Sequence, residues 1–334
     1  MQYPKQIFCA LILLTQFAFA QNSTGFYLSG NYAIASSGGW DYISVGPGNN
    51  RIYVSHGTQV NILNEDNGDS VSMIPGTTGV HGIAFAASLN KGFTSNGRLN
   101  TVTVFNLQTN AIITQIETGQ NPDAIMFDDY SKRIITCNGR SKDLSLIDPQ
   151  TDKVVATIPV TGKPETAVSD GAGKIYVNIE DKNQIDVIDL AAGKDVASWS
   201  LAPAEGPTGL AIDRKTKRLF AGCEKLLVVM NAENGQIVDK LPISDGCDGV
   251  GFDSKLQYVF ASCGSGKLCV INEVNASKFL AMDPVDTKRS ARTIAVDENK
   301  HVVFLPAAQL EAAAPGERPK MVPGTFQVLV VKKK

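Results

Sequence analysis

The chain has 334 residues, and its 31 basic residues nearly balance its 33 acidic residues. This balance gives no electrostatic reason to expect nucleic acid as a partner. No segment reaches the roughly 18 consecutive apolar residues that a membrane-spanning helix needs. Length, charge and hydropathy therefore argue against a basic nucleic-acid-binding protein and against a helical membrane protein.

The first 20 residues predict a signal peptide. Lys5 supplies a positive charge, Ile7–Phe19 is apolar but too short to span a membrane, and Ala18-Phe19-Ala20 matches a small-x-small cleavage site. The mature chain is expected to form a single domain over residues 21–334. We expect this domain to be exported, either to a periplasm or to the extracellular space.

A repeat of about 42 residues runs through most of the chain. Each unit has four short, apolar-alternating segments that are separated by Gly, Asn, Asp and Pro. One unit reads Ile83-Ala-Phe, Gly92-Phe-Thr-Ser-Asn, Val102-Thr-Val-Phe-Asn and Ile112-Ile-Thr-Gln-Ile. Four strands per unit at a fixed period of this size are typical of a β-propeller. Because a propeller places equivalent positions around one axis, the repeat predicts which distant residues meet.

The residue just before the first strand of each unit sets the register. Seven such positions recur at intervals of 40 to 44 residues: Asp41, His81, Asp123, Glu165, Thr208, Asp248 and Arg292. They predict an all-β fold, a seven-bladed β-propeller with four-stranded blades. The last unit lacks a fourth strand, and residues 25–35 belong to no other unit. We therefore expect this N-terminal segment to be the outer strand of the C-terminal blade, which closes the ring.

A proline-rich linker, Ala307–Gly324, joins the second and third strands of the last unit. It follows the end of a second strand, and in a propeller this end lies on the same face as the start of the inner strand. We expect the linker to form a partial lid over the channel mouth on that face.

Two rings of side chains are expected at this mouth. The seven positions that set the register form the inner ring. The ends of the second strands form another: His56, Asn96, Asn138, Ile179, Cys223, Cys263 and Pro306. The candidate ligand-binding residues are Asp41, His56, His81, Asn96, Asp123, Asn138, Glu165, Asp248 and Arg292.

The chemistry of these residue types favours a cation or a polar ligand. Clustered carboxylates raise the pKa of some members or recruit a cation. Oxygen ligands suit Ca²⁺ or Mg²⁺, and imidazole extends the choice to Zn²⁺ or Mn²⁺. The expected metal ligands are Asp123, Glu165, Asp248 and Asn138, with His81 or His56 as a candidate general base. Alternatively, Arg292 holds a ligand carboxylate, or the rings only satisfy backbone groups at the strand ends.

Five cysteines remain after the expected signal peptide, and four of them fall in two adjacent units. Cys247 begins a first strand and Cys263 ends the following second strand, so antiparallel pairing brings them together. In an oxidising compartment we expect a disulfide between them. Pairing of Cys263 with Cys269 or with Cys223 stays open, because spacing does not decide connectivity.

Several stretches carry a family resemblance. Leu146–Val160 reads LIDPQTDKVVATIPV, and Gly119-Gln-Asn-Pro-Asp and Gly162-Lys-Pro-Glu precede two inner strands. Across most of residues 38–304 the chain resembles the YVTN-repeat propellers, the YncE-like or surface-layer-type group of exported bacterial proteins. The resemblance implies a seven-bladed fold whose members serve as binding modules or as parts of larger assemblies. Related seven-bladed folds include lactonases and lyases with a divalent cation in the channel.

The leading interpretation is a monomeric, exported binding or scaffold module that takes an unknown small molecule or protein partner at the channel mouth. The alternative is a divalent-metal-dependent lactonase or lyase with the metal in the central channel. A subunit that supports a redox enzyme is a third, weaker interpretation, because no cofactor motif is present.

Overall fold

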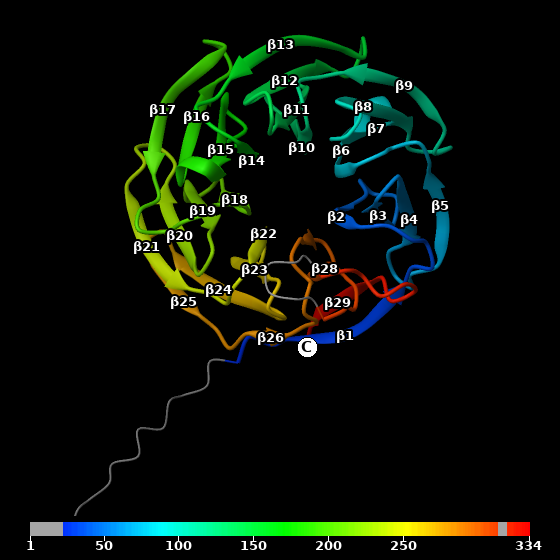
Figure 1. Cartoon of the computed structure of the whole chain (residues 1–334). Helices are drawn as coiled ribbons and strands as arrows, with labels where there is room; N and C mark the ends of the chain where they lie inside the picture. Colours follow the sequence, from blue (N-terminus) through cyan, green and yellow to red (C-terminus); the bar gives the residue numbers. More distant parts are fainter. Residues whose placement is uncertain (1–22, 313–318) are drawn as a thin grey trace, which may run out of the picture.

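Seven antiparallel sheets stand around a central axis in this protein (Figure 1). The structure is a computed structural model that describes residues 23–312 and 319–334. The expected signal peptide, residues 1–20, lies outside the described residues. Almost all regular structure is β-strand, so the prediction of an all-β, seven-bladed propeller is confirmed. Among the described residues, no helix has the length and apolar character required to cross a bilayer.

The first three blades follow one another along the chain, and each is built from the axis outward. Blade 1 contains β2 (Trp40–Val45), β3 (Arg51–His56), β4 (Gln59–Asn64) and β5 (Ser70–Ile74). Blade 2 contains β6 (Val80–Ala86), the 3₁₀ helix η1 (Ala87–Leu89), β7 (Lys91–Asn96), β8 (Thr101–Asn106) and β9 (Ile112–Glu117). Blade 3 contains β10 (Pro122–Asp128), β11 (Arg133–Asn138), β12 (Asp143–Asp148) and β13 (Lys153–Pro159).

The next three blades repeat this order. Blade 4 contains β14 (Pro164–Ser169), β15 (Lys174–Ile179), the 3₁₀ helix η2 (Glu180–Lys182), β16 (Gln184–Asp189) and β17 (Lys194–Ser200). Blade 5 contains β18 (Leu210–Asp213), β19 (Arg218–Gly222), β20 (Leu226–Asn231) and β21 (Ile237–Pro242). Blade 6 contains β22 (Cys247–Asp253), β23 (Tyr258–Cys263) and β24 (Lys267–Asn275), with β25 (Lys278–Ala281) and β26 (Val285–Asp286) both paired to β24.

Blade 7 joins the two ends of the described chain. Its strand order from the axis is β27 (Ala295–Asp297), β28 (Val302–Ala307), β29 (Gln327–Lys333) and β1 (Phe26–Ala33). β1 pairs antiparallel with β29, and the Lys334 amide donates to the Gly25 carbonyl at 2.7 Å. The expected closure of the ring by an N-terminal outer strand is therefore confirmed, and it leaves β29 without a free edge.

One turn recurs between the inner and second strands of the blades. In six blades the residue directly before the second strand adopts a left-handed conformation, with φ between 53° and 59°. These residues are Asn50, Asn90, Lys132, Lys217, Gln257 and His301, and Gly173 takes the position in blade 4 with φ 111°. Asn and Gly tolerate this conformation well, and the repeat of turn residues in the sequence reflects it.

The hydrophobic core lies between neighbouring blades. Between blades 1 and 2, the Tyr53 ring lies 4.9 Å from the ring of Phe85 and 5.9 Å from that of Phe105. Gly92 makes room for this packing, because a Cβ added there would lie 2.1 Å from the Phe105 ring. Since each blade buries both faces of its middle strands in this way, the blades hold the inner strands in fixed positions around the axis.

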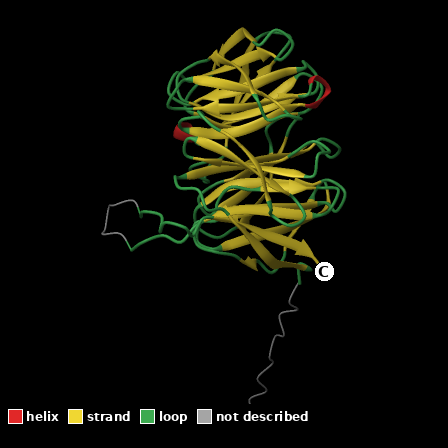
Figure 2. Ribbon diagram, turned by 90° about the vertical axis from the view of Figure 1, so that its right-hand side faces the viewer, coloured by secondary structure: helices red, strands yellow, loops and turns green. Residues whose placement is uncertain are grey.

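The linker between β28 and β29 differs from the expected lid. Leu310 and Met321 pair as an isolated bridge, and the Glu311 amide donates to the Lys320 carbonyl at 2.8 Å. Figure 2 shows the described residues of this linker projecting outward from one face at the side of the propeller. They form a paired arm that points away from this face instead of lying flat across the mouth, and backbone pairing within the arm satisfies some of its polar groups.

Candidate functional site

The inner ring occupies equivalent positions at one end of the channel. Its seven members are partly buried and lie at the second residue of the inner strand or two to three residues before it: Asp41, His81, Asp123, Glu165, Thr208, Asp248 and Arg292. In five blades the pairing register shifts at this point, for example between Pro122 and Ile125. Such a bulge re-aims a side chain. Thr208 is already engaged, since its hydroxyl donates to the Cys247 carbonyl at 2.8 Å.

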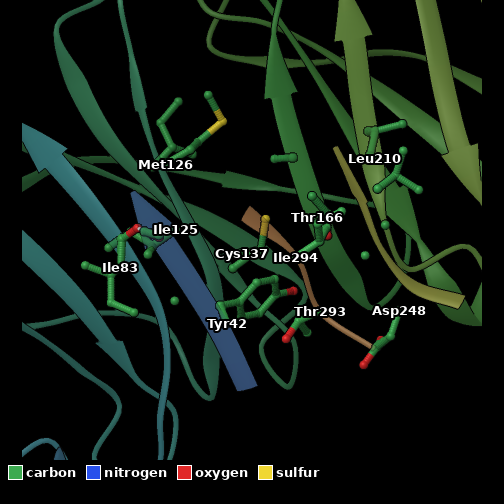
Figure 3. A pocket seen from close by; sticks show the side chains of 18 residues that line it. Tyr42, Ile83, Ile125, Met126, Cys137, Thr166, Leu210, Asp248, Thr293 and Ile294 are labelled. Carbon is green, nitrogen blue, oxygen red and sulfur yellow. The ribbon is translucent and has the colours of Figure 1, made fainter. Parts of the chain in front are cut away.

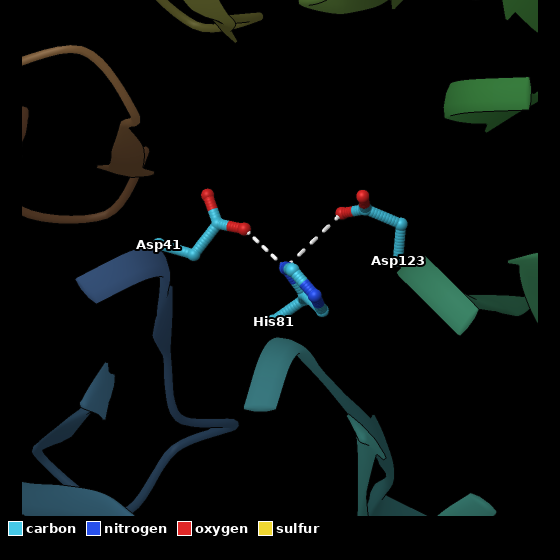
Figure 4. A group of neighbouring side chains, drawn as sticks. All are labelled: Asp41, His81 and Asp123. Atoms are coloured by element: carbon cyan, nitrogen blue, oxygen red, sulfur yellow. Dashed lines mark hydrogen bonds and ion pairs between the residues drawn. The ribbon is translucent and has the colours of Figure 1, made fainter. Parts of the chain in front are cut away.

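Five ring side chains form a continuous acid–base chain across blades 3, 2, 1, 7 and 6. His81 Nδ1 lies 2.5 Å from Asp41 Oδ2 and 3.6 Å from Asp123 Oδ1 (Figure 4). Arg292 forms an ion pair with Asp248, and its Nη2 lies 3.8 Å from Asp41 Oδ1. Asp41 therefore connects the imidazole to the guanidinium. The structure brings these five sequence-predicted residues together as expected.

A second acid–base cluster extends the mouth at blade 4. Lys163 Nζ donates to Glu165 Oε1 at 2.7 Å and also contacts the carboxylate of Glu180, in η2. Lys163 and Glu180 were not among the candidate residues from the sequence. Lys163 follows the glycine of the connector before β14, and Glu180 opens the polar loop after β15, so both could have been found from their proximity to strand ends.

The basic groups of the ring hold their protons more tightly than in water. Burial by itself would lower the pKa of His81, but the hydrogen bond to Asp41 and the charge of Asp123 raise this pKa overall. Burial likewise opposes the charge on Arg292, yet the carboxylates of Asp248 and Asp41 raise its pKa. Both shifts run against the effect of burial, so the mouth has a negative electrostatic potential.

Asp123 and Glu165 of the ring also bind protons more tightly than in water. Burial is the main cause that raises the pKa of Asp123 to about 6, while the charge of His81 opposes it and that of Asp41 adds to it. Burial and then the charge of Asp123 raise the pKa of Glu165 to about 8, against the effect of Lys163. Burial also opposes the charge on Lys163, but its hydrogen bond to Glu165 raises the lysine pKa. Crowded carboxylates thus surround a small number of basic groups.

His56 does not reach the mouth, contrary to the expected second ring. Its side chain is fully buried, and its ring centroid lies 4.1 Å from that of Phe326. Nδ1 lies 2.6 Å from Ser36 Oγ, and Nε2 lies 2.8 Å from the Gly38 carbonyl. Burial lowers the pKa of this imidazole. With both ring nitrogens occupied, His56 supports the segment that leads into β2.

The two amides of the second ring are also turned into their blades. Asn96 is fully buried and donates to Thr103 Oγ1 at 2.8 Å. Asn138 is equally buried and donates to Asp143 Oδ1 at 2.7 Å and to Ser145 Oγ at 2.9 Å. The second strand lies inside the blade, so its last side chain bonds to the third strand instead of facing the axis. The sequence-based placement of these residues at the mouth is corrected accordingly.

Three residues of the inner ring present a possible cation site. Asp41, His81 and Asp123 each offer one ligand atom, and these atoms lie within 4.8 Å of one another. The expected metal ligands were Asp123, Glu165, Asp248 and Asn138. The two sets share only Asp123, since Asn138 is committed within blade 3 and Asp248 is paired with Arg292.

The cysteines lie as the strand pairing predicts, but as free thiols. Cys247 on β22 is directly opposite Cys263 on β23. Both are buried, and the structure contains no disulfide between them. Cys269 on β24 is paired with Ala261 on β23. It therefore lies two residues along β24 from the position opposite Cys263. The expected juxtaposition of Cys247 and Cys263 is present, and the bond between them stays a prediction.

A cavity of about 160 Å³ lies in the channel. All seven blades contribute to its lining, six through their inner strands and blade 7 through the segment before β27: the lining includes Tyr42, Ile83, Ile125, Met126, Thr166, Ala167, Leu210, Asp248, Val250, Thr293 and Ile294. Figure 3 shows Tyr42, Thr293 and Asp248 toward one end of this cavity and Met126 and Leu210 toward the other. The sequence analysis did not identify this cavity, although the apolar residues of the inner strands were visible.

Comparisons with known proteins support the fold. No model of a known protein family matches this chain, and no curated protein gives a significant sequence match. The YVTN-repeat resemblance therefore stays an expectation. Among solved structures, the chain is similar to one described as Kuenenia stuttgartiensis hydrazine synthase, with a TM-score of 0.73 and 14% sequence identity. The match covers 84% of this chain and 95% of that chain. At this identity the likeness concerns the propeller fold alone.

Proposed function

We propose that this protein is a binding module that takes a positively charged group in the mouth of its channel. The observation that carries this proposal is the excess of carboxylates there. Five acidic groups lie beside only three basic groups, and each base is already engaged by an acidic side chain: the acids are Asp41, Asp123, Glu165, Asp248 and Glu180. The raised pKa of Glu165, about 8, leaves this group mostly protonated at neutral pH, and a bound cation would displace its proton. An added cation would relieve the repulsion between the carboxylates.

The ligand class is a small molecule with an ammonium group, or the cationic side chain of a protein partner. A charge-assisted hydrogen bond between an ammonium group and a partly desolvated carboxylate contributes about 1.5 to 3 kcal/mol. We further propose that the protein acts after export and as a monomer, as its first 20 residues and its closed ring of blades favour.

The test uses n-butylamine, titrated calorimetrically into the mature protein at neutral pH. Asp123→Asn should weaken binding by roughly tenfold or more, because it removes a charge that contacts the ligand. Asp129→Asn is the matched control: it makes the same change just beyond the other end of β10, where Asp129 is exposed. Equal affinity of the wild type and Asp123→Asn for n-butylamine would show that the amine does not bind at the channel mouth.

A divalent-metal-dependent lactonase or lyase is the second candidate function. The observation in its favour is the group formed by Asp41, His81 and Asp123, whose ligand atoms lie close together. One imidazole nitrogen and two carboxylate oxygens suit Zn²⁺ or Mn²⁺. When bound, such an ion would act as a Lewis acid on a substrate carbonyl. The three residues would hold the ion, and His81 would then be unable to act as general base through the same nitrogen.

Elemental analysis distinguishes this candidate from simple binding. The enzyme hypothesis expects about one equivalent of divalent metal in protein purified from metal-supplemented medium, and a lower melting temperature after chelation. Both effects should disappear in His81→Asn. Protein that contains no metal, and that melts at the same temperature with and without chelator, would exclude the metal-dependent enzyme.

A further inference from the structure

The cavity in the channel is apolar over most of its lining. Ile83, Ile125, Leu210, Val250 and Ile294 occupy equivalent positions, two residues after the ring residue of their blades. Each of these side chains also packs in the hydrophobic cluster between its own blade and the preceding blade, so the lining is held in place. No described side chain fills this cavity, so a ligand can occupy it.

The cavity and the charged ring are continuous. Asp248 belongs to the ring and also lines the cavity, and Tyr42 and Thr293 follow the ring residues Asp41 and Arg292. Figure 3 shows the Asp248 carboxylate at one end and the apolar side chains at the other. Burial, followed by the charges of the ring carboxylates, raises the pKa of Tyr42 well above its usual value, which agrees with its position directly beneath the ring. One ligand can therefore contact both regions.

The size of the cavity indicates the size of the buried group. An engineered apolar cavity of about 150 Å³ in another protein stays dry and binds benzene. The cavity here has a volume of about 160 Å³, which holds about six carbon atoms, and five of its lining residues also line a second space of about 390 Å³ further along the channel. A small hydrated ion would leave this apolar space empty, and an uncharged apolar molecule would not balance the excess of acidic groups over basic groups in the ring.

We propose that the channel binds an amphiphilic primary amine, with its ammonium group at the carboxylate ring and an apolar group of about six carbons in the cavity below. This inference rests on the proposed function of the mouth and extends it by naming the ligand class. The two parts contribute separately: the ring provides electrostatic attraction, and the cavity provides a hydrophobic contribution that increases with the buried apolar area.

A homologous series of ligands tests the inference on the unmodified mature protein. Methylamine, n-butylamine, n-hexylamine and n-octylamine are titrated calorimetrically, with n-hexanol and hexanoate for comparison. We expect affinity to rise roughly threefold to fourfold for each methylene. The gain per methylene should become smaller beyond about six carbons, where the alkyl chain passes out of this cavity into the wider space along the channel. n-Hexanol should bind more weakly than n-hexylamine, and hexanoate should not bind.

A substitution that fills the cavity provides the second test. Ala167 lines the cavity, so Ala167→Leu should move the point at which the gain per methylene becomes smaller from about six carbons to about three, while leaving methylamine affinity within about twofold. Ala156→Leu makes the same change on the exposed outer strand β13 and should leave the whole series unaltered. If Ala167→Leu does not fold, the ligand series on the wild type still decides the question.

The possible outcomes separate the two proposals. Methylamine binding with no dependence on chain length would overturn the amphiphile and leave the cation-binding mouth intact. No binding by any amine would overturn both proposals. If alcohols and amines of the same length bind with equal affinity, the cavity binds the alkyl chain without help from the ring. That result would overturn the assignment of an ammonium group to the ring.

Discussion

At the scale of single residues, buried acids join neighbouring blades on the face opposite the mouth. Four inner strands end in a buried aspartate: Asp128, Asp213, Asp253 and Asp297. Each accepts hydrogen bonds from backbone amides of the turn that follows it. Each also contacts a side chain of the next blade: Ser169, Glu273, His301 and Glu65, respectively. The turn contacts follow from local sequence, whereas the partners across the blades depend on the closed ring.

The pair formed by Glu65 and Asp297 is the most informative of these contacts. Glu65 is 5% exposed, and its Oε1 atom is buried with no donor beside it. Burial, followed by the hydrogen bond with Asp297, raises the pKa of Glu65 to about 7, against the charge of Lys300. Glu65 therefore holds its proton more tightly than an exposed glutamate does, at the boundary between blades 7 and 1 where the ring closes.

This raised pKa predicts a pH-dependent stability difference for Glu65→Gln. The folded protein binds the Glu65 proton more tightly than the unfolded chain, so wild-type stability falls as pH rises from about 4.5 to about 7 and then levels. Glutamine keeps the donor at every pH. The free energy of unfolding of the variant, measured by urea denaturation relative to wild type, should therefore increase by about 2 to 3 kcal/mol between pH 4.5 and pH 8.

The control for this experiment is Glu233→Gln, which removes an exposed carboxylate that pairs with Lys217. Its stability relative to wild type should change little over the same range, because exposed ion pairs contribute little. A Glu65→Gln curve parallel to that of wild type would show that the carboxyl is not protonated in the folded state.

At the scale of elements, the position of a strand within its blade decides the role of its side chains. The middle strands are almost completely buried, as in β7 and β11, and their polar side chains bond within the blade. The inner strands have one edge on the channel, and bulges direct the ring residues toward it. This is why the inner ring is at the mouth while His56, Asn96 and Asn138 are not.

The outer strands are less regular and more exposed than the inner and middle strands. β9 and β13 expose apolar side chains such as Ile113 and Val155, and the outer edge of blade 6 is divided between β25 and β26. These positions lie far from the channel, so their irregularity does not alter the ring. Site geometry therefore depends on the inner and middle strands, and the outer strands mainly cover them.

At the scale of the whole molecule, the N-terminal strand holds the ring closed. β1 pairs along its length with β29, and Phe26 packs against Phe260 of blade 6 with ring centroids 5.0 Å apart. β1 therefore contacts both its own blade and the one before it. Without this strand, blade 7 would have an open edge and the boundary with blade 6 would lose an aromatic contact.

Removal of β1 should therefore destabilise the entire propeller. A chain that begins at Ser36 lacks β1, and a chain that begins at Ser23 retains it as the matched control. We expect the shorter chain to lose more than about 3 kcal/mol of unfolding free energy, from Phe26 burial and strand pairing together. Size-exclusion chromatography should also show association through the exposed β29 edge. Equal melting temperatures and elution volumes for the two chains would contradict this role for β1.

Much of the architecture is readable from the sequence because its signals are local. The repeat of Gly, Asn and Asp at turns, together with alternating apolar residues, predicts strands, their order and the number of blades. The leftover segment at residues 25–35 predicts the closure. The inner ring also follows from the repeat, since Asp41, His81 and Asp123 hold equivalent positions in successive units.

The sequence by itself thus determined the seven-bladed ring, its closure and the set of charged residues at one mouth. Only the tertiary structure decided which polar residues remain available there, because hydrogen bonds inside the blades occupy His56, Asn96 and Asn138. It also decided that Lys163 and Glu180 join the mouth and that an apolar cavity lies below it. The physical reason is that spacing along a chain specifies strands and turns, whereas side-chain pairing and empty volume depend on how the blades pack against one another.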